Sequence, residues 1–439
     1  MSDDQRTRRA DNAIAVVRRA PFSDNPLVGA RGQRTQQRIL DAALRMFGDE
    51  GFHGCSVDRI AKVARCSRVS FYQYFASKEE VFQHLAGQVA RQLSASTEAL
   101  DPLTPDRRGW EALRAWVGRY AEIYTRYEPV FHAYESDAAL GALAARTGEA
   151  TIARFHSRLV TTTPPPRQLD AVIRLLLACL NHTFGVTGIL RSGARSVAPD
   201  AYKADRVEDA VADVLHRTLF GGRIDVNMRL PNGAPPPALE FSPAMFDVFQ
   251  EDDAIRPSAS RNRALAALLE SGRAVFVDRG YHGTRVDDLA AAAGVSHGAF
   301  YRYFRNKDQL ARILTARAMQ SVWTTAIEIP DLFADGSEGP AALRRWLRRY
   351  HVAHANEAAM LRVWVDGALQ DPTLRSESAP PLDWGRRRMA RYLQPRGFGD
   401  VDMDAVILVA LLGVVGAQER QADKVEAAAQ LIERGLLGR

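Results

Sequence analysis

The sequence predicts an all-α protein in which one helical unit occurs twice. Two observations predict this fold class: apolar residues recur at helical spacing, and a shift of 229 residues lays one half of the chain onto the other. In the matched segments, Phe47–Val81 and Phe276–Leu310, 15 of 35 positions are identical. The likeness continues downstream, where Trp116 pairs with Trp346. A whole two-part unit is therefore duplicated within the 439 residues.

Each matched segment predicts three helices joined by short turns. In the first copy, apolar residues at helical spacing lead to Gly51, which favours a left-handed helix stop, and Ser56 is placed to cap a short second helix. In the second copy, Gly294 permits a tight turn and Ser296 can cap a third helix that carries Phe300 inward. Short helix, turn and short helix together predict a helix-turn-helix.

Composition and charge indicate a soluble globular protein with basic heads. Apolar residues make up 46% and charged residues 25% of the chain. The net charge is +6, and the matched segments with their flanks carry +3 (Arg31 to Leu85) and +4 (Ser258 to Ile313). A basic excess on small helical heads is typical of nucleic-acid binding.

Cellular location follows from the cysteines and the apolar runs. Three cysteines cannot form a disulfide framework, which favours a reducing compartment. The N-terminus lacks a signal-peptide core, and the longest apolar run, Ala405–Ala417, is shorter than a membrane span. We expect a cytoplasmic, nucleoid-associated protein that does not enter the membrane and needs neither metal nor cofactor.

The heads resemble those of the TetR family of bacterial transcriptional regulators. GVSHGAFYRYFRNKDQL in the second copy is close to the family pattern, whereas the first copy departs from it at Arg65, Cys66 and Val69, where Gly, Val and Gly are usual. The resemblance implies a three-helix DNA-binding head followed by a helical domain that binds a ligand and dimerises. In architecture and length the chain is similar to tandem TetR regulators of actinobacteria, including the type that represses mammalian-cell-entry operons.

On this basis the chain divides into six parts. They are a basic arm (1–30), a first head (31–85), a first helical regulatory domain (86–222), a Pro-rich linker (223–257), a second head (258–313) and a second helical regulatory domain (314–439).

Residues expected to contact DNA follow from the family pattern. Base reading falls to the start of the third helix, because arginine can bind guanine and small apolar side chains can touch a thymine methyl; these residues are Arg68, Val69, Ser70, His297, Gly298 and Ala299. Phosphate contacts fall to Ser56, Tyr72, Lys78, Thr284, Tyr301 and Lys307. Alternatively, tyrosines such as Tyr74 and Tyr303 simply pack the heads. The arm, which contains Arg6, Arg8 and Arg9, is interpreted either as a minor-groove binder or as a solvated tail.

Aromatic residues in the helical domains suggest an apolar ligand pocket or, equally, an ordinary helix core. The candidates are Tyr120, Tyr124, Phe131, Trp346, Tyr350 and Trp364. Two weaker alternatives concern other side chains. His351, His354 and Glu357 share helical spacing suited to a metal, and Cys55 and Cys66 could form a redox switch, but a solvated face and packed thiols are commoner.

The function expected is a sequence-specific DNA-binding regulator, a repressor released from its operator by a small-molecule effector. The two helical domains are expected to pair within the chain, with Ala405–Ala417 at the seam and scope for further self-association. Because the heads differ at their base-reading positions, the double-stranded operator should have two unlike half-sites. The rival interpretations are an architectural protein that binds DNA without sequence preference and, less favoured, an enzyme, because no polar catalytic group recurs at corresponding positions.

Overall fold

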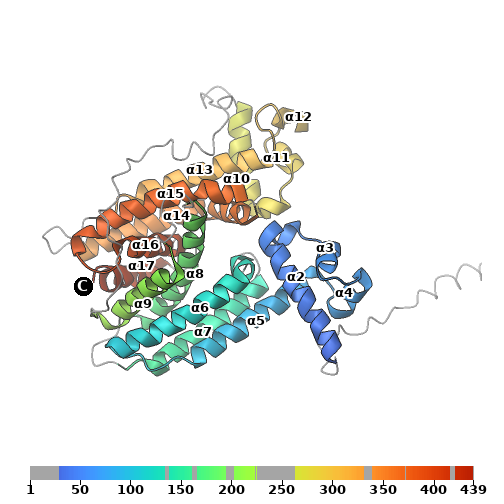
Figure 1. The fold of residues 1–439 in the computed structure, drawn as a ribbon. Coiled ribbons are helices and arrows are strands. Elements are labelled where there is room, and N and C mark those ends of the chain that lie inside the picture. The colour runs from blue at the N-terminus through green and yellow to red at the C-terminus, as the bar shows by residue number, and fades with distance from the viewer. Residues whose placement is uncertain are drawn as a thin grey trace, which may run out of the picture. The chain divides into compact units, whose positions relative to one another are not determined.

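The computed structural model consists of helices joined by short connections in the residues it describes (Figure 1). These are residues 29–133, 138–160, 166–193, 202–222, 224, 263–330, 339–370, 372–415 and 421–438. The chain divides into two compact units, Met1–Gly87 and Gln88–Arg439. The all-α prediction is confirmed, while the predicted arm and linker lie almost entirely outside the described residues.

The first unit contains the first head. Its helices are α2 (Ala30–Gly54), α3 (Val57–Val63), α4 (Arg68–Tyr74) and the start of α5 (Lys78–Glu98). Gly51 interrupts α2 with φ 71°, as expected for the helix stop. The Ser56 hydroxyl caps α3 and the Ser67 hydroxyl caps α4, each by accepting a hydrogen bond from a backbone N–H three residues on.

The second head, in the second unit, repeats this plan. Its helices are α10 (Arg263–Gly283), α11 (Val286–Ala292), α12 (His297–Phe300) and α13 (Lys307–Ala326). Ser296 caps α12 and Asn306 caps α13. Phe300 is 0% exposed, so its predicted inward position is confirmed, and Phe304, beyond the end of α12, is 1% exposed.

The turn between the second and third helices of each head requires a left-handed residue. Arg65 has φ 54° and Gly294 has φ 66°. The same backbone hydrogen bond closes both turns, from Cys66 N to Ala61 O and from Val295 N to Ala290 O, each 3.0 Å. A residue with a Cβ is disfavoured in this conformation, so the first head contains strain that glycine avoids in the second.

Each copy continues into four longer helical segments. The first copy has α6 (Arg107–Ala133), α7 (Ala138–Arg158), α8 (Leu169–Gly193) and α9 (Ala204–Phe220). The second has α14 (Gly339–Gln370), α15 (Pro372–Leu393), the short η4 (Gln394–Arg396), α16 (Val401–Val415) and α17 (Gln421–Gln430), which runs into the π-helical η5 (Leu431–Leu436). An ion pair recurs in both copies: Arg114 contacts Glu208 at 2.5 Å, and Arg344 contacts Glu426 at 2.7 Å.

Helices from the two copies pack against each other inside the second unit. Helix α8 lies against α15, α16 and α17, and α9 lies against η5. The Cys179 thiol, on α8, donates a hydrogen bond to the Ile407 carbonyl of α16 at 3.5 Å. Residues Leu169–Arg191 are long and apolar enough, by composition alone, to cross a membrane. Their packing against α16 is typical of a core helix in a folded domain.

A buried ionic cluster joins α9 to the second copy. Arg217, whose side chain is 2% exposed, lies 3.0 Å from both Asp213 and Asp404. Arg396 also binds Asp404, which is fully buried. Desolvation raises the pKa of Asp213 to about 6, although the neighbouring Arg217 opposes the shift. The ring of Phe398 lies beneath both guanidinium groups, with its centroid 5.1 Å from Arg217 and 4.7 Å from Arg396.

We expect Asp404→Ala to lower the free energy of unfolding by about 3 to 5 kcal/mol, because two buried guanidinium groups lose their shared carboxylate. The midpoint of urea denaturation of the full chain, followed by circular dichroism, measures this. Glu111→Ala removes an exposed ion pair with Arg107 and is the control, with an expected effect below about 0.5 kcal/mol. Equal shifts for the two variants would contradict the role assigned to Asp404.

We expect Arg65→Gly to stabilise the first head by about 1 kcal/mol, because glycine relieves the left-handed strain. The reciprocal change, Gly294→Arg, should destabilise the second head by a similar amount, since a Cβ at Gly294 meets no atom within 4 Å and only the backbone conformation is strained. Hydrogen exchange of head peptides in the full chain measures both changes. Unchanged or slower exchange in the second head of Gly294→Arg would contradict the strain assigned to the turn.

Candidate nucleic-acid interface

The start of the third helix in each head presents its predicted base-reading residues outward. Val69 is 72% exposed, and Arg68 is exposed beside it. In the second head His297 and Gly298 are exposed and Ala299 is half-buried, as Ser70 is in the first head. The opposite face of each helix is anchored by a fully buried phenylalanine, Phe71 or Phe300. Each head thus has one outward face at the predicted position.

The first residue of each third helix is held by an aspartate and a tyrosine. Arg68 Nε lies 3.4 Å from Asp58 Oδ1, and Arg68 Nη1 donates to Asp58 Oδ2 at 3.4 Å. The Arg68 guanidinium also lies over the Tyr72 ring, 5.7 Å from its centroid. These two partners raise the pKa of Arg68, the hydrogen bond with Tyr72 more than the charge of Asp58.

The second head repeats this arrangement with histidine in place of arginine as the first residue of the third helix. His297 Nδ1 lies 2.5 Å from Asp287 Oδ1, and the rings of His297 and Tyr301 are 5.2 Å apart. The sequence predicted DNA contacts for Arg68 and His297 and for the two tyrosines, but the prediction did not include either aspartate. The signal was available, because Asp58 and Asp287 are identical residues at matching positions of the repeat.

Lys78 and Lys307, predicted as phosphate contacts, bind backbone carbonyl groups inside their own heads. Lys78 Nζ donates to Phe52 O at 2.9 Å and Cys55 O at 3.1 Å, at the end of α2. Lys307 Nζ makes the same two bonds at the end of α10, with the same distances. Burial lowers the pKa of Lys307. Each lysine therefore caps a helix C-terminus, and a phosphate contact would have to share its ammonium group.

Ser56 and Thr284 do not occupy equivalent positions. Ser56 is exposed at the N-cap of α3, whereas Thr284 is 1% exposed and donates from Oγ1 to Gly280 O at 2.7 Å. Arg285 takes the N-cap position in the second head. The expectation that Thr284 reaches phosphate is therefore corrected, because its hydroxyl group is buried and already bonded.

An ion pair beside this position is reversed in sign between the heads. Arg59 on α3 binds Glu50 on α2, whereas Asp288 on α11 lies 2.5 Å from Arg279 on α10. The same two positions of the repeat thus carry opposite charges in opposite order. Both heads retain the contact while presenting different charge at the start of the second helix.

The tyrosines and cysteines proposed as alternatives have packing roles. Tyr74 is 8% exposed and Tyr303 is half-buried. The Cys55 thiol donates to Met46 O at 3.0 Å, and burial, with Glu50 nearby, raises its pKa to about 11. Burial also raises the pKa of Cys66. Thiols with raised pKa values are poor nucleophiles, which favours packing over a redox switch.

The predicted ligand-pocket residues in the first copy form a packed aromatic cluster. Tyr120 and Tyr124 each contact both Phe131 and Phe184, and the ring centroids are 5.0 to 6.2 Å apart. In the second copy Trp346 and Tyr350 are also buried, and Trp346 Nε1 donates to Thr325 O at 2.9 Å. Burial raises the pKa of Tyr350. The side chain of Trp364 lies outside the described residues.

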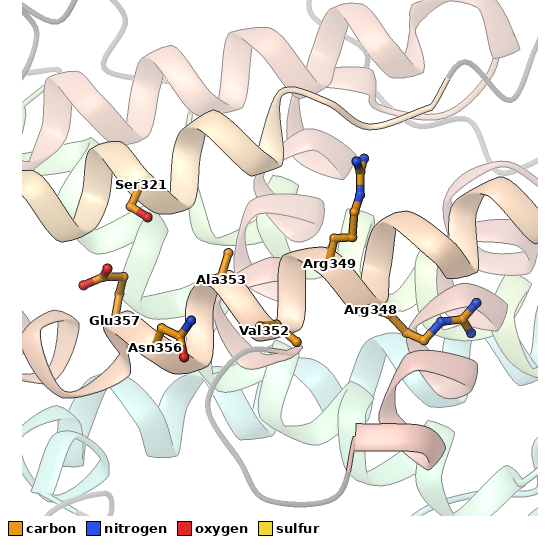
Figure 2. A pocket seen from close by; sticks show the side chains of 7 residues that line it. All are labelled: Ser321, Arg348, Arg349, Val352, Ala353, Asn356 and Glu357. Atoms are coloured by element: carbon orange, nitrogen blue, oxygen red, sulfur yellow. The ribbon is translucent and has the colours of Figure 1, made fainter.

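An open groove of about 550 Å³ lies elsewhere, between α13 and α14. It is lined by Ser321, Arg348, Arg349, Val352, Ala353, Asn356 and Glu357, and Figure 2 shows all but Ser321 projecting from α14. None of these residues belongs to the predicted pocket. Glu357 binds Arg273 at 2.9 Å, and His351 Nδ1 lies 2.7 Å from Val415 O. Among the described residues no group of three or more His, Cys, Asp or Glu could hold a metal ion.

Both heads are similar to one family of known proteins. The model of the bacterial regulatory proteins of the tetR family matches residues 39–85 and 268–313. The chain is 37% identical over 71 residues to the uncharacterized HTH-type transcriptional regulator YdgC of Bacillus subtilis, covering 16% of this chain and 36% of that protein. It is 31% identical over 104 residues to the HTH-type transcriptional repressor NicS of Pseudomonas putida, covering 23% and 47%. The chain thus spans less than half the length of these curated relatives.

Among solved structures, the chain is similar to the TetR family transcriptional regulator PfmR from Thermus thermophilus, with 24% identity and a TM-score of 0.31. The match covers 41% of this chain and 97% of that one. Proteins of the matched family are transcriptional regulators and not enzymes. The chain therefore carries a helix-turn-helix head in each half, and the model of this family matches a segment of each head.

Proposed function

We propose that this protein is a sequence-specific DNA-binding transcriptional regulator that uses two unlike heads on one asymmetric operator. The observation that carries the proposal is that two complete heads occur in one chain with different residues at the outward start of the third helix. Arg68 in the first head corresponds to His297 in the second. A guanidinium group and an imidazole ring present different hydrogen-bonding edges to a base pair, so the half-sites should differ.

In this proposal each exposed face divides into base and phosphate contacts. Bases are read by Arg68, Val69 and Ser70 in the first head and by His297, Gly298 and Ala299 in the second. Tyr72, Tyr301 and Ser56 contact phosphate, with the lysines at the head edges contributing positive charge. Tyr72 and Tyr301 are 40% and 50% exposed, which supports their assignment.

The two helical domains pair within the chain and set the distance between the heads. The packing of α8 and α9 against α15, α16 and η5 supports this arrangement. Two heads must lie about 34 Å apart, or a multiple of that distance, to enter successive major grooves on one side of DNA. In this arrangement the chain consists of the same six parts that its sequence predicts: an arm, a head, a helical domain, a linker, a second head and a second helical domain.

The regulator acts in the cytoplasm as a repressor that a small effector releases. The effector would favour a head spacing that no longer fits the operator, which is a shift between two populations. The aromatic clusters around Tyr124 and Tyr350 favour an apolar effector, and likeness in length to tandem repressors of mammalian-cell-entry operons favours a lipid-derived one. Because these clusters are packed, an effector would have to open them.

Selection of bound duplexes from random DNA, followed by footprinting, tests the proposal. We expect two unlike half-sites, with Arg68→Ala removing base preference in one and His297→Ala in the other. Arg107→Ala removes an exposed cation from α6, outside the heads, and should leave both half-sites unchanged. A palindrome that responds to only one of the two head variants would contradict the proposal.

Binding without sequence preference is the alternative function, and salt dependence separates the two. Contacts to phosphate alone weaken steeply with salt and do not discriminate between sequences. We therefore expect the selected duplex to bind at least about 10³-fold more tightly than a scrambled one at physiological salt. A ratio near one would establish the architectural function instead.

A further inference from the structure

An aspartate in each head contacts the residue that the proposed function assigns to base reading. Asp58 is the second residue of α3 and Asp287 the second residue of α11, 229 positions apart. Each reaches across the turn to the first residue of the third helix, at Arg68 or His297. The same contact thus occurs twice, although the residue that it holds has changed.

Neither aspartate makes the capping hydrogen bond that begins its helix; other residues do. Their side chains are 62% and 76% exposed. Ser56 caps α3, and Asp288, not Asp287, accepts the backbone N–H of Arg285 at 3.0 Å. An acid in the first turn favours a helix through its dipole, but that effect does not require a contact with the next helix.

In the first head the contact orients the guanidinium group. Asp58 engages Nε and Nη1 of Arg68, and the Tyr72 ring lies against the same group. With Asp58 at Nη1 and beside Nε, Nη2 is the guanidinium nitrogen that can donate to guanine O6 or N7. A side chain that is already ordered loses less entropy when it binds.

In the second head the contact selects one nitrogen of the imidazole ring. Asp287 occupies Nδ1 of His297, so Nε2 is the ring nitrogen left to meet a base edge. The Tyr301 ring lies beside the imidazole and limits its rotation. In both heads, therefore, an aspartate and a tyrosine orient the residue that is proposed to read bases, although that residue differs.

We propose that Asp58 and Asp287 are specificity-determining positioning residues, which hold Arg68 and His297 in the conformations that read bases. This inference rests on the proposed function of the heads. The carboxylate has a second effect, because its negative charge disfavours binding of Arg68 or His297 to a phosphate group. Losing the aspartate should therefore weaken binding to the selected duplex and strengthen binding to scrambled DNA.

The test compares binding of the full chain to selected and scrambled duplexes. We expect Asp58→Asn and Asp287→Asn each to lower the selected-to-scrambled affinity ratio by about threefold to tenfold, with relaxed base preference confined to the half-site of the altered head. The matched controls are Asp49→Asn and Asp278→Asn, which remove a charge at corresponding exposed positions of α2 and α10. They should leave base preference unchanged.

A second comparison separates positioning from a general effect of charge. In the Arg68→Ala background, Asp58→Asn should no longer alter base preference, because its target is absent, and the same should hold for Asp287→Asn with His297→Ala. The inference is overturned if either aspartate variant keeps the wild-type preference, matches its control, or acts equally with and without its reader. Hydrogen exchange verifies that each head is folded, and if one variant head unfolds the other head decides. Failure of the wild type to select any sequence would overturn the proposed function as well.

Discussion

The buried contact between Arg217 and Asp404 is the constraint on which the arrangement of the two helical domains depends. Arg217 comes from the first copy and Asp404 from the second, and both side chains are almost inaccessible to water. A buried charge is costly unless it is paired, so substitution of either residue would leave the other short of a partner inside the interface between the two copies. Arg396, bound to the same carboxylate, strengthens this dependence. Helices α8 and α16 supply apolar burial beside the cluster, and the ionic contacts join α9 to the second copy.

In the described part of the chain, the residue that matches Asp404 in the repeat makes a different contact. The segments Asp170–Ile173 and Asp404–Ile407 share the sequence DAVI, yet Asp170 is exposed and lies 2.5 Å from His156. Arg434, at the end of the second copy, donates instead to the carbonyl groups of Thr218 and Leu219. The duplicated halves have therefore diverged at their contact as well as in their heads. A seam that differs on its two sides favours pairing of unlike halves over pairing of identical ones.

Local features were predictable from sequence, whereas most contacts between helices were not. The serine caps, the stop at Gly51 and the strained turn at Arg65 follow from rules that act over a few residues. The lysine bonds to α2 and α10 span 23 to 26 positions, and the Arg217–Asp404 contact spans 187. Residue spacing does not encode such distances. Asp58 and Asp287 are identical in the repeat, but their contacts with Arg68 and His297 depend on the turn that places the second helix beside the third.

In the proposed function, one chain supplies both heads to one operator. Light scattering of the purified protein–DNA complex, with a duplex that contains both selected half-sites, tests it most directly. We expect one chain for each duplex, with loss of the complex when either half-site is scrambled. Two chains on each duplex, both bound through the same head, would contradict it.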